Sequence, residues 1–276
     1  MTVTTSEAAV LVDQAAEALA GRTIAVLTGA GVSTDSGIPD YRGVGAPQRT
    51  PMTIAQFLGS ERARKRYWAG SHLGWALFGA AQPNAGHFAL ADLERRGVAS
   101  GVITQNVDGL HLRAGSSVVV PLHGAMDRVL CLSCGQVFAR ADIAQRIDEL
   151  NPQLRQPDAV MLNPDGDVDV ADVDGFLVPA CTVCGGWLKP DVVFFGEFVP
   201  PDRFAEARAL VHSAEALLVA GSSLVVNTGI RLIEQARRRK LPIVIVNRGA
   251  TKGDSSAAVK IDGGTTQTLT ALAERL

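Results

Sequence analysis

Short apolar runs alternate with amphipathic stretches along most of the chain. The apolar runs are residues 23–28, 101–103, 118–120, 216–219 and 243–246. Runs that are apolar throughout are typical of strands buried on both faces of a parallel sheet. Apolar positions at helical spacing predict helices at 6–20, 83–96, 201–212, 228–240 and 268–276. The alternation predicts an α/β fold in which helices cover both faces of a parallel sheet.

Two stretches depart from this alternation. Residues 53–78 have a broken helical pattern rich in aromatic side chains, and a loop with glycine and proline (42–51) precedes them. From Cys131 to Cys184 the chain becomes polar, acidic and turn-rich. We interpret this second stretch as an insertion into the α/β domain that carries all four cysteines.

A glycine-rich segment follows the first predicted strand and begins Gly29-Ala30-Gly31. Glycine has no Cβ, so backbone N–H groups can approach a phosphate closely, and the start of a following helix adds unpaired donors. The segment therefore predicts nucleotide binding. The pattern G-x-G-x-x-G is incomplete, because the next glycine is Gly37, and no acidic residue follows a second strand at the usual spacing. An ordinary NAD-dependent dehydrogenase is therefore disfavoured.

Polar clusters follow several of the predicted strands. They are Gln105-Asn106-Val107-Asp108, His123, Gly221-Ser222-Ser223 and Asn247. In an open parallel sheet, ligands bind at the carboxyl ends of the strands, so we expect these clusters to meet at one edge. Amide and carboxylate groups there can bind ribose hydroxyls, a carboxamide or a water molecule. The alternative is a turn whose side chains are satisfied locally.

His123 is the candidate catalytic base. A histidine titrates near neutrality, so it can accept a proton from a hydroxyl group at pH 7. A lone histidine is more often structural, and the polar clusters at the same edge favour the catalytic interpretation. His72, His87, His111 and His212 lie in predicted helices or loops and are interpreted as structural or surface residues.

The cysteines form two Cys-x-x-Cys pairs. They are Cys131, Cys134, Cys181 and Cys184. Two such turns can complete a tetrahedron of thiolates around one zinc ion, and the glycines directly after each pair allow the positive φ that these turns need. We predict a closed, structural zinc site, with two redox dithiols or buried free cysteines as the alternative.

Composition excludes several classes of protein. Hydrophobic residues make up 47% of the 276 residues, which argues against disorder, and the net charge of −2 gives no basic field for nucleic acid or anionic membranes. No apolar run approaches the roughly 20 residues that span a bilayer. Residues 1–10 contain no Lys or Arg, unlike a secretory or transit peptide, so we expect a soluble, cytoplasmic protein.

Taken together and in order, these motifs resemble those of the sirtuins, the NAD-dependent protein-lysine deacylases. The resemblance spans nearly the whole chain. It rests on Gly29-Ala30-Gly31-x-Ser33, Gly37-Ile38-Pro39-Asp40-Tyr41-Arg42, Thr104-Gln105-Asn106-x-Asp108, Leu122-His123-Gly124, both Cys-x-x-Cys pairs, Lys189-Pro190-Asp191-x-Val193-x-Phe195-Gly196-Glu197, Gly221-Ser222-Ser223-Leu224 and Asn247.

The resemblance implies a domain organisation. It implies a Rossmann-like NAD-binding domain, a small helical module that covers the cofactor and a zinc-binding module. The expected bounds are 1–44, 83–124 and 191–276 for the NAD-binding domain, 45–82 for the helical module and 125–190 for the zinc module.

The resemblance also implies a set of residues around NAD. The pyrophosphate would lie on the glycine loop and on Ser222-Ser223, and the adenosine end would reach Asn247. Asn106 and Asp108 would hold the nicotinamide ribose and carboxamide. The full expected set is Gly29, Ala30, Gly31, Ser33, Asp40, Tyr41, Arg42, Gln105, Asn106, Asp108, Gly221, Ser222, Ser223, Asn247, Arg248 and Gly249.

The family mechanism fits these residues. The acyl oxygen of a modified lysine attacks the ribose carbon as nicotinamide leaves, and His123 acts as base through the ribose hydroxyls, with Asn106 and Asp108 as the other expected catalytic residues. Water then completes the release of lysine and an O-acyl-ADP-ribose. The peptide would pair with Val193, Phe194, Phe195, Gly196 and Glu197, although an ordinary core strand is an equal alternative there. Structural Zn²⁺ would stay away from the reaction.

The acyl group is a separate prediction. Sirtuins selective for acidic acyl groups carry Tyr-x-x-Arg in the helical module, whereas here the residue three positions after Tyr67 is Gly70. Tyr41 stands where many relatives carry Phe. The segment Arg66-Tyr67-Trp68 and the insertion 163–167 are most similar to the class II branch, whose members remove long or branched acyl groups or transfer ADP-ribose. We therefore expect a preference for acyl groups larger than acetyl.

Two other functions remain open. An NAD-dependent protein ADP-ribosyltransferase would use the same cofactor, and a non-catalytic NAD-responsive binding module would not need a base such as His123. A zinc-ribbon nucleic-acid adaptor is disfavoured by the acidic insertion and the negative net charge. The expected partner is an acyl-lysine protein or peptide, with no nucleic acid or membrane partner, and we expect a monomer.

Overall fold

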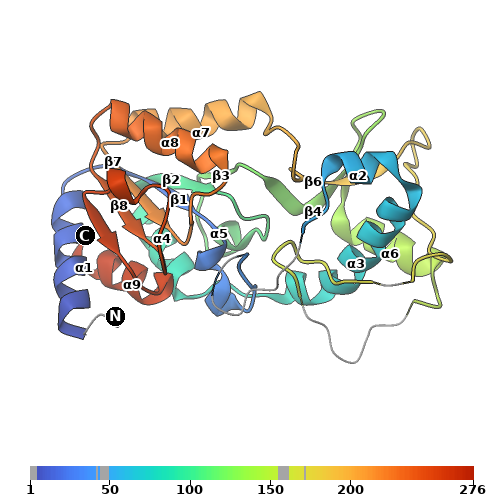
Figure 1. Cartoon of the computed structure of the whole chain (residues 1–276), viewed down its shortest axis with the longest axis horizontal. Helices are drawn as coiled ribbons and strands as arrows, with labels where there is room; N and C mark the ends of the chain where they lie inside the picture. The colour runs from blue at the N-terminus through green and yellow to red at the C-terminus, as the bar shows by residue number, and fades with distance from the viewer. Residues whose placement is uncertain (1–4, 42, 44–49, 155–161, 171) are drawn as a thin grey trace.

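The computed structural model describes residues 5–41, 43, 50–154, 162–170 and 172–276, and the chain forms two lobes side by side (Figure 1). We call them the large lobe, which holds both ends of the described chain, and the small lobe. None of the helices in these described ranges has both the length and the apolar character to span a bilayer.

A six-stranded parallel sheet forms the centre of the large lobe. Its strand order is β3-β2-β1-β7-β8-β9. The strands are β1 (Ile24–Thr28), β2 (Ala99–Thr104), β3 (Val119–Pro121), β7 (Ala216–Ala220), β8 (Ile243–Val246) and β9 (Val259–Ile261). Taken in chain order this is the 3-2-1-4-5-6 arrangement of a doubly wound sheet, whose direction of winding reverses between β1 and β7.

Helices cover both faces of this sheet, as the apolar runs predict. In β1, Ile24 and Val26 pack on one face, against α1 (Thr5–Leu19), α4 (Ala85–Arg95) and α9 (Thr265–Arg275). Ala25 and Leu27 point to the other face, against α7 (Pro201–Ser213) and α8 (Asn227–Arg238). Because both sets of side chains are fully buried, the strand is apolar without alternation. The predicted α/β fold is confirmed.

The small lobe contains a second, antiparallel sheet in the order β5-β4-β6. Its strands are β4 (Gly124–Cys131), β5 (Val137–Ala139) and β6 (Leu188–Val192). Its helices are α2 (Ile54–Gly59), α3 (Glu61–Ala80) and α6 (Arg140–Leu150), and a shared apolar core joins helices and sheet. We propose that the two lobes correspond to the NAD-binding domain and the two inserted modules expected from the sequence.

Three local predictions are wrong. The insertion expected to be turn-rich contains α6, which buries Ile143 and Ile147. The apolar run 192–195 is not a strand of its own, because β6 ends at Val192. The glycine-rich segment leads into two 3₁₀ turns, Ala30–Val32 and Thr34–Ser36, rather than directly into the helix start expected after it. Beyond these, α5 (Leu110–Arg113) and a third 3₁₀ turn (Asp254–Ser256) complete the regular structure of the described residues.

Candidate active site

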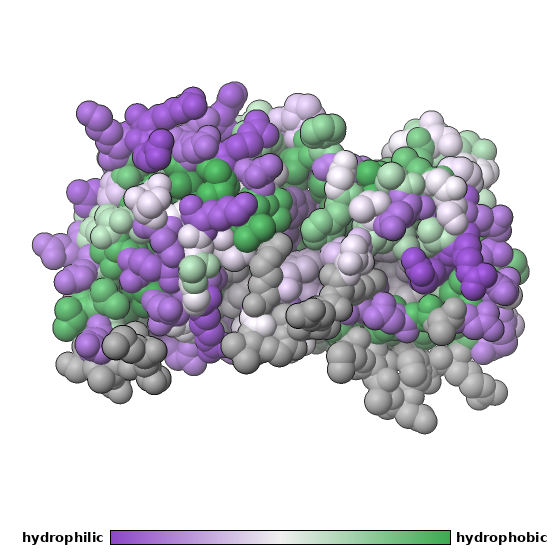
Figure 2. Space-filling view, in the orientation of Figure 1, coloured by the Kyte–Doolittle hydropathy of each residue, from purple (hydrophilic) through white to green (hydrophobic). Residues whose placement is uncertain are grey.

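A cleft of about 1200 Å³ lies at the carboxyl edge of the large sheet and is lined by residues of both lobes. In the space-filling view the surface is hollowed between the lobes, with apolar residues beside the hollow (Figure 2). The cleft brings together nearly all of the predicted cofactor, base and peptide residues. They are Gly29, Ala30, Gly31, Ser33, Asp40, Tyr41, Gln105, Asn106, Asp108, His123, Val193, Phe194, Phe195, Gly196, Glu197, Gly221, Ser222, Ser223, Asn247, Arg248 and Gly249. Arg42 lies outside the described residues.

Two glycine turns meet where the sheet reverses direction. Gly31 donates its N–H to the carbonyl of Gly221 at 2.9 Å. A Cβ on Gly31 would lie 2.8 Å from the Cα of Gly221, and a Cβ on Gly29 would lie 2.7 Å from the carbonyl oxygen of Gly221. Gly221 itself has φ +64°, which favours glycine. The glycines are therefore needed for turn-against-turn packing as well as for an exposed backbone.

A hydrogen-bonded network joins the ends of β1 and β2. Ser33, 1% exposed, donates from Oγ to Asp108 Oδ2 at 2.7 Å. Asn106 Nδ2 donates to Ser33 Oγ at 3.1 Å and to the carbonyl of Gly29 at 3.1 Å. Asp108 also accepts from the backbone N–H of Leu110 at 2.9 Å. The network fixes the amide and carboxylate expected to bind the nicotinamide ribose and carboxamide.

His123 faces the cleft with its proton position set by the backbone. Its Nδ1 lies 3.0 Å from the carbonyl oxygen of Gln105, which can only accept, so Nδ1 carries the proton in the neutral ring. Nε2 then holds the lone pair, and it lies 3.2 Å from Thr228 Oγ1. Burial lowers the pKa of His123 below 6.5, and the hydrogen bond to Gln105 opposes part of that shift. At neutral pH the ring is therefore uncharged and able to accept a proton at Nε2.

Gln105 ties the two halves of the site together. Its side-chain oxygen accepts from Ser222 Oγ at 2.6 Å, while its backbone carbonyl orients His123. Its backbone N–H donates to the carbonyl of Thr28 at 3.0 Å, which continues the β1–β2 pairing. One residue thus links the turn after β7 to the candidate base.

The adenosine end expected from the sequence lies at the end of β8. Asn247, 8% exposed, donates from Nδ2 to the carbonyl of Arg248 at 2.8 Å and to that of Gly249 at 3.3 Å. Sequence reasoning missed the start of α9 beside it, because the helix was expected to begin at residue 268. Thr265 lines the cleft and donates from Oγ1 to the carbonyl of Gly31 at 2.8 Å. The paired glycines at 263–264 are the sequence signal that could have marked this turn.

The segment expected to bind the peptide is held in an irregular, extended form. Val193 donates its N–H to the carbonyl of His123 at 2.8 Å, and Phe195 forms an isolated parallel bridge with Thr53. Phe194 is buried, while Phe195 is 39% exposed and Phe198 is 94% exposed. The segment is therefore not a regular strand: Phe194 belongs to the apolar core of the small lobe, whereas Phe195 and Phe198 remain open to a partner.

Tyr41 and side chains from the small lobe line one end of the cleft. Tyr41 donates its hydroxyl hydrogen to Asp165, and its ring meets that of Phe195 edge-on at 6.2 Å. Burial and the carboxylate of Asp165 raise the pKa of Tyr41, so its hydroxyl stays protonated. Tyr67 and Asp167 line the same end. Sequence reasoning left open whether the insertion reaches the site, and the structure places its residues 164–167 there.

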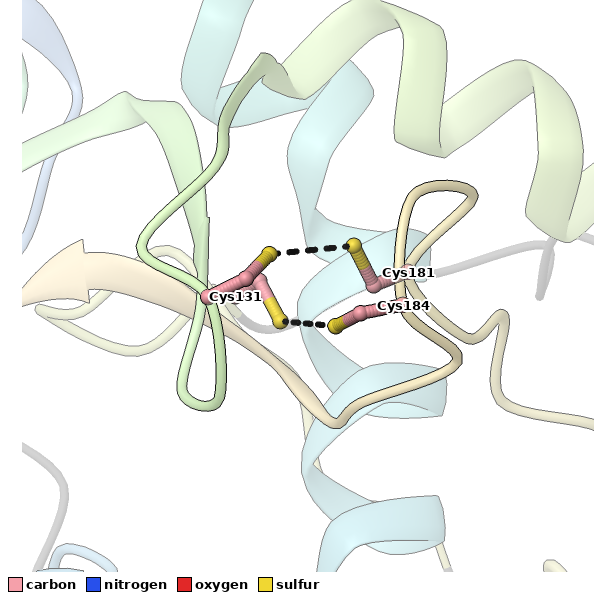
Figure 3. A group of neighbouring side chains, drawn as sticks. Cys131, Cys181 and Cys184 are labelled. Atoms are coloured by element: carbon pink, nitrogen blue, oxygen red, sulfur yellow. Dashed lines mark hydrogen bonds between the residues drawn. The ribbon is translucent and has the colours of Figure 1, made fainter.

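The four cysteines come together where β4 ends and just before β6 begins (Figure 3). All four sulfurs lie within 4.8 Å of one another, with 3.5 Å between Cys131 and Cys184 and 3.8 Å between Cys134 and Cys181. Thiolates about 2.3 Å from one ion at tetrahedral angles are about 3.8 Å apart. Backbone N–H groups, that of Cys134 first, lower the pKa of the Cys131 thiol to about 6. Distances and donors therefore fit a structural zinc ion.

Comparison with known proteins agrees with this geometry. The model of the Sir2 family matches residues 29–228. An NAD-dependent protein deacetylase 1 of Streptomyces coelicolor is 53% identical over 265 residues, which are 95% of this chain and 88% of that protein. The human mitochondrial NAD-dependent protein lipoamidase sirtuin-4 is 48% identical over 244 residues, 86% of this chain and 77% of that protein.

Solved structures are similar over nearly their whole length. The structure described as Sir2-p53 peptide-NAD+ has a TM-score of 0.75 and 32% identity, and the similarity covers 94% of this chain and 95% of that one. A structure described as Sir2 bound to acetylated peptide also has a TM-score of 0.75, with 30% identity, 95% of this chain and 97% of that one.

Proposed function

The chain belongs to the Sir2 family, and from that premise we propose that it is an NAD-dependent enzyme that removes acyl groups from lysine side chains of proteins. The names of its bacterial relatives and of the human lipoamidase support NAD-dependent protein deacylation. The similar Sir2 complexes with NAD⁺ and with an acetylated peptide support an acyl-lysine substrate. One observation of the chain itself carries the proposal most directly: His123 is a neutral, backbone-oriented base on the cleft.

NAD fits the polar edge of the large sheet. The exposed backbone at Ala30 and Gly31, with Ser222, would hold the pyrophosphate, and Asn247 the adenosine end. Asn106 and Asp108 would hold the nicotinamide ribose and carboxamide. When bound, NAD supplies an electrophilic ribose carbon for the acyl oxygen, with nicotinamide as leaving group.

Each of these residues would have a distinct role in the reaction. His123 accepts a ribose hydroxyl proton at Nε2, while the Gln105 carbonyl holds its Nδ1–H and stabilises the imidazolium that forms. The Asn106–Ser33–Asp108 network keeps donors and acceptors oriented before substrate arrives, so little reorganisation is needed during the reaction. Zinc at the cysteine cluster would hold the small lobe folded, away from the cleft.

The peptide would pair along residues 193–197, and the acyl chain would enter past Tyr41 and Phe195 toward Tyr67. We infer that acyl groups larger than acetyl are favoured, because the cleft continues into the small lobe at this end. The lipoamidase name of the human relative supports a preference of this kind.

The test incubates the zinc-loaded protein with NAD and lysine peptides carrying acetyl, butyryl, octanoyl or lipoyl groups. Mass spectrometry should detect nicotinamide, free lysine and O-acyl-ADP-ribose, with a higher kcat/KM for the longer groups. A protein product that carries ADP-ribose would instead assign a transferase, and the absence of NAD consumption would refute both. Highest kcat/KM for acetyl would refute only the preference for larger groups.

A pair of histidine variants tests the site. His123→Tyr should abolish turnover, because it removes the base at Nε2. His212→Tyr is the matched control, since His212 is exposed on α7 and is absent from the lining of the cleft. Both variants should retain the thermal stability of the parent protein, and turnover by His123→Tyr would remove this residue from the mechanism.

A further inference from the structure

The imidazole of His123 is held from two sides. On one side its Nδ1 donates to the backbone carbonyl oxygen of Gln105 at 3.0 Å. On the other side its Nε2 lies 3.2 Å from Oγ1 of Thr228, a residue that lines the cleft. Gln105 follows β2, and Thr228 is the second residue of α8. The ring therefore bridges the end of β2 and the first turn of α8.

The first turn of α8 packs closely against the residues around the base. A Cβ on Gly229 would lie 2.9 Å from Cδ2 of Leu224 and 3.4 Å from Nε2 of Gln105. Gly229 is buried, and Leu224 just before the helix has a φ of +56°, which residues other than glycine rarely adopt. Threonine is branched at Cβ, so its χ1 angle has little freedom. The fold therefore fixes where the Thr228 hydroxyl lies relative to the ring.

A hydroxyl group can serve both protonation states of this ring. In neutral His123 the proton is on Nδ1, so Nε2 accepts and the Thr228 hydroxyl donates to it. Once Nε2 carries a proton it can only donate, and the same hydroxyl can rotate and accept. Hydrogen bonds to an ionised group are roughly twice as strong as those between neutral groups. The Thr228 hydroxyl therefore stabilises the imidazolium more than it stabilises the neutral ring.

The elements around the ring carry charged side chains that have partners of their own. They are Asp108 after β2, Glu197 of the segment 193–197, Arg231 on α8, and Asp191 with Arg203 between β6 and α7. Burial lowers the pKa of His123 and the hydrogen bond to Gln105 raises it, and among the described residues no charge contributes to the shift. The partners that set the behaviour of the ring are therefore the uncharged ones at its two nitrogens.

We propose that Thr228 is a positioning residue for the reaction: its hydroxyl keeps Nε2 of His123 directed into the cleft and stabilises the imidazolium that forms there. The inference rests on the proposed deacylase function. When Nε2 accepts a proton, its lone pair forms the new N–H bond, and the Thr228 oxygen becomes the acceptor beside that bond. Without the hydroxyl, Gln105 would still hold the proton on Nδ1, but the nitrogen that reacts would lose its partner.

Nitrogen NMR of the histidine rings tests this inference in the zinc-loaded protein without NAD. The signals of His123 are those that are missing from His123→Tyr. Thr228→Val removes the hydroxyl and keeps the shape, and it should lower the pKa of His123 by at least about half a pH unit. Thr228→Ser keeps the hydroxyl and should restore the parent value.

Two outcomes of the titration would refute the inference. One is an unchanged pKa of His123 in Thr228→Val, which would mean that the hydroxyl does not act on the ring. The other is a pKa that rises toward 6.5, which would mean that the substitution only lets water reach the ring. Thermal unfolding checks that each variant folds, and Thr228→Ala takes the place of Thr228→Val if that variant does not.

Kinetics with NAD and an acyl-lysine peptide give a second readout. Thr228→Val should lower kcat about tenfold or more, because the hydrogen bond to the charged ring is lost. Thr228→Ser should stay within about threefold of the parent protein. The Kd for NAD, measured by calorimetry, should change less than about twofold in both variants, because the lost interaction acts on the base and not on the bound cofactor.

Thr270→Val is the matched control. Thr270 lies on α9 and donates its hydroxyl hydrogen to the carbonyl of Thr266 at 2.9 Å, and it does not line the cleft. This variant should leave kcat and the pKa of His123 unchanged. An unchanged kcat in Thr228→Val, or an equal loss in Thr270→Val, would overturn the assignment of Thr228.

The NMR measurement needs no turnover, so it separates this inference from the proposed function. If the parent protein consumes no acyl peptide with NAD, the deacylase function is wrong, even where the titration shows that Thr228 acts on His123. If the parent protein turns over and Thr228→Val changes neither the pKa of His123 nor kcat, only the role of Thr228 is wrong.

Discussion

Lys189 is a buried cation that holds the proposed peptide-binding segment, and its removal offers a sharp test of how that segment is built. Lys189 is 3% exposed, and its ammonium lies 3.1 Å from the carboxylate of Glu197. It also donates to the carbonyl of Val192 and lies 4.8 Å from the ring centroid of Phe194. The same carboxylate accepts the N–H of Phe194 at 2.9 Å, so one ion pair closes this turn of the chain.

The structure sets the size of the expected effects. Breaking a fully buried ion pair by removing one partner costs about 3–5 kcal/mol. The Glu197 side chain is 30% exposed, so water can partly solvate the Lys189 ammonium when the carboxylate is removed. We therefore expect Glu197→Gln to lower the free energy of unfolding by about 2 kcal/mol. Lys189→Met leaves the Glu197 carboxylate without its partner, but this carboxylate can rotate toward solvent. We therefore expect the free energy of unfolding to decrease by only about 1 kcal/mol. In the double variant the decrease in the free energy of unfolding should be about 1 kcal/mol smaller than the sum of the decreases in the two single variants.

Urea unfolding of the zinc-loaded proteins measures these free energies, and KM for an acyl peptide reports on the segment. Glu197→Gln should raise this KM, because Phe194 and its neighbours lose their anchor. Glu61→Gln, which breaks the helical pair between the exposed Glu61 and Lys65, is the control and should change the free energy of unfolding by less than about 0.5 kcal/mol. Additive losses in the double variant would refute the coupling between Lys189 and Glu197.

Three further predictions concern the base, the metal and the glycine turns. As the pH is lowered, kcat/KM should decrease with a midpoint below pH 6.5, because burial lowers the pKa of His123 and only its neutral form accepts a proton. A midpoint above pH 6.5 would contradict this. Chelation of zinc should unfold the small lobe reversibly, and Cys131→Ser should do so permanently, as followed by circular dichroism and metal analysis; native-like spectra without zinc would exclude a structural metal. Gly31→Ala should lower the free energy of unfolding by about 1–3 kcal/mol and raise KM for NAD, because its Cβ would lie 2.8 Å from the backbone of Gly221. Gly59→Ala at the end of α2 meets no atom within 4 Å, and it should lower neither the stability nor the affinity for NAD, because alanine favours a helix more than glycine does.

The regular elements of the large lobe could be predicted because the pattern of apolar residues in each element matches the faces that it buries. Strand β1 is buried on both faces and is therefore apolar at every position except its last. Helix α6 escaped prediction because its local sequence is mostly polar and charged, and Ile143 and Ile147 provide its apolar contacts only once β4 packs beside them. The run 192–195 was misleading for the opposite reason: Phe194 is apolar because it packs against Phe57 and Tyr67 of other elements, not because it lies in a strand.

Local sequence specifies the chemical groups that follow the strands of the large sheet: a glycine-rich turn, an amide and carboxylate cluster and His123. It also specifies the two cysteine pairs of the insertion. Such features are local, because backbone conformation and side-chain chemistry are properties of a few consecutive residues. Long-range packing determines that the turn of Gly31 packs on that of Gly221, that Gln105 orients His123, and that Asp165 and Asp167 of the insertion line one end of the cleft. These contacts join segments far apart in the chain, and they form only where the packing of the whole sheet and both lobes brings the segments together.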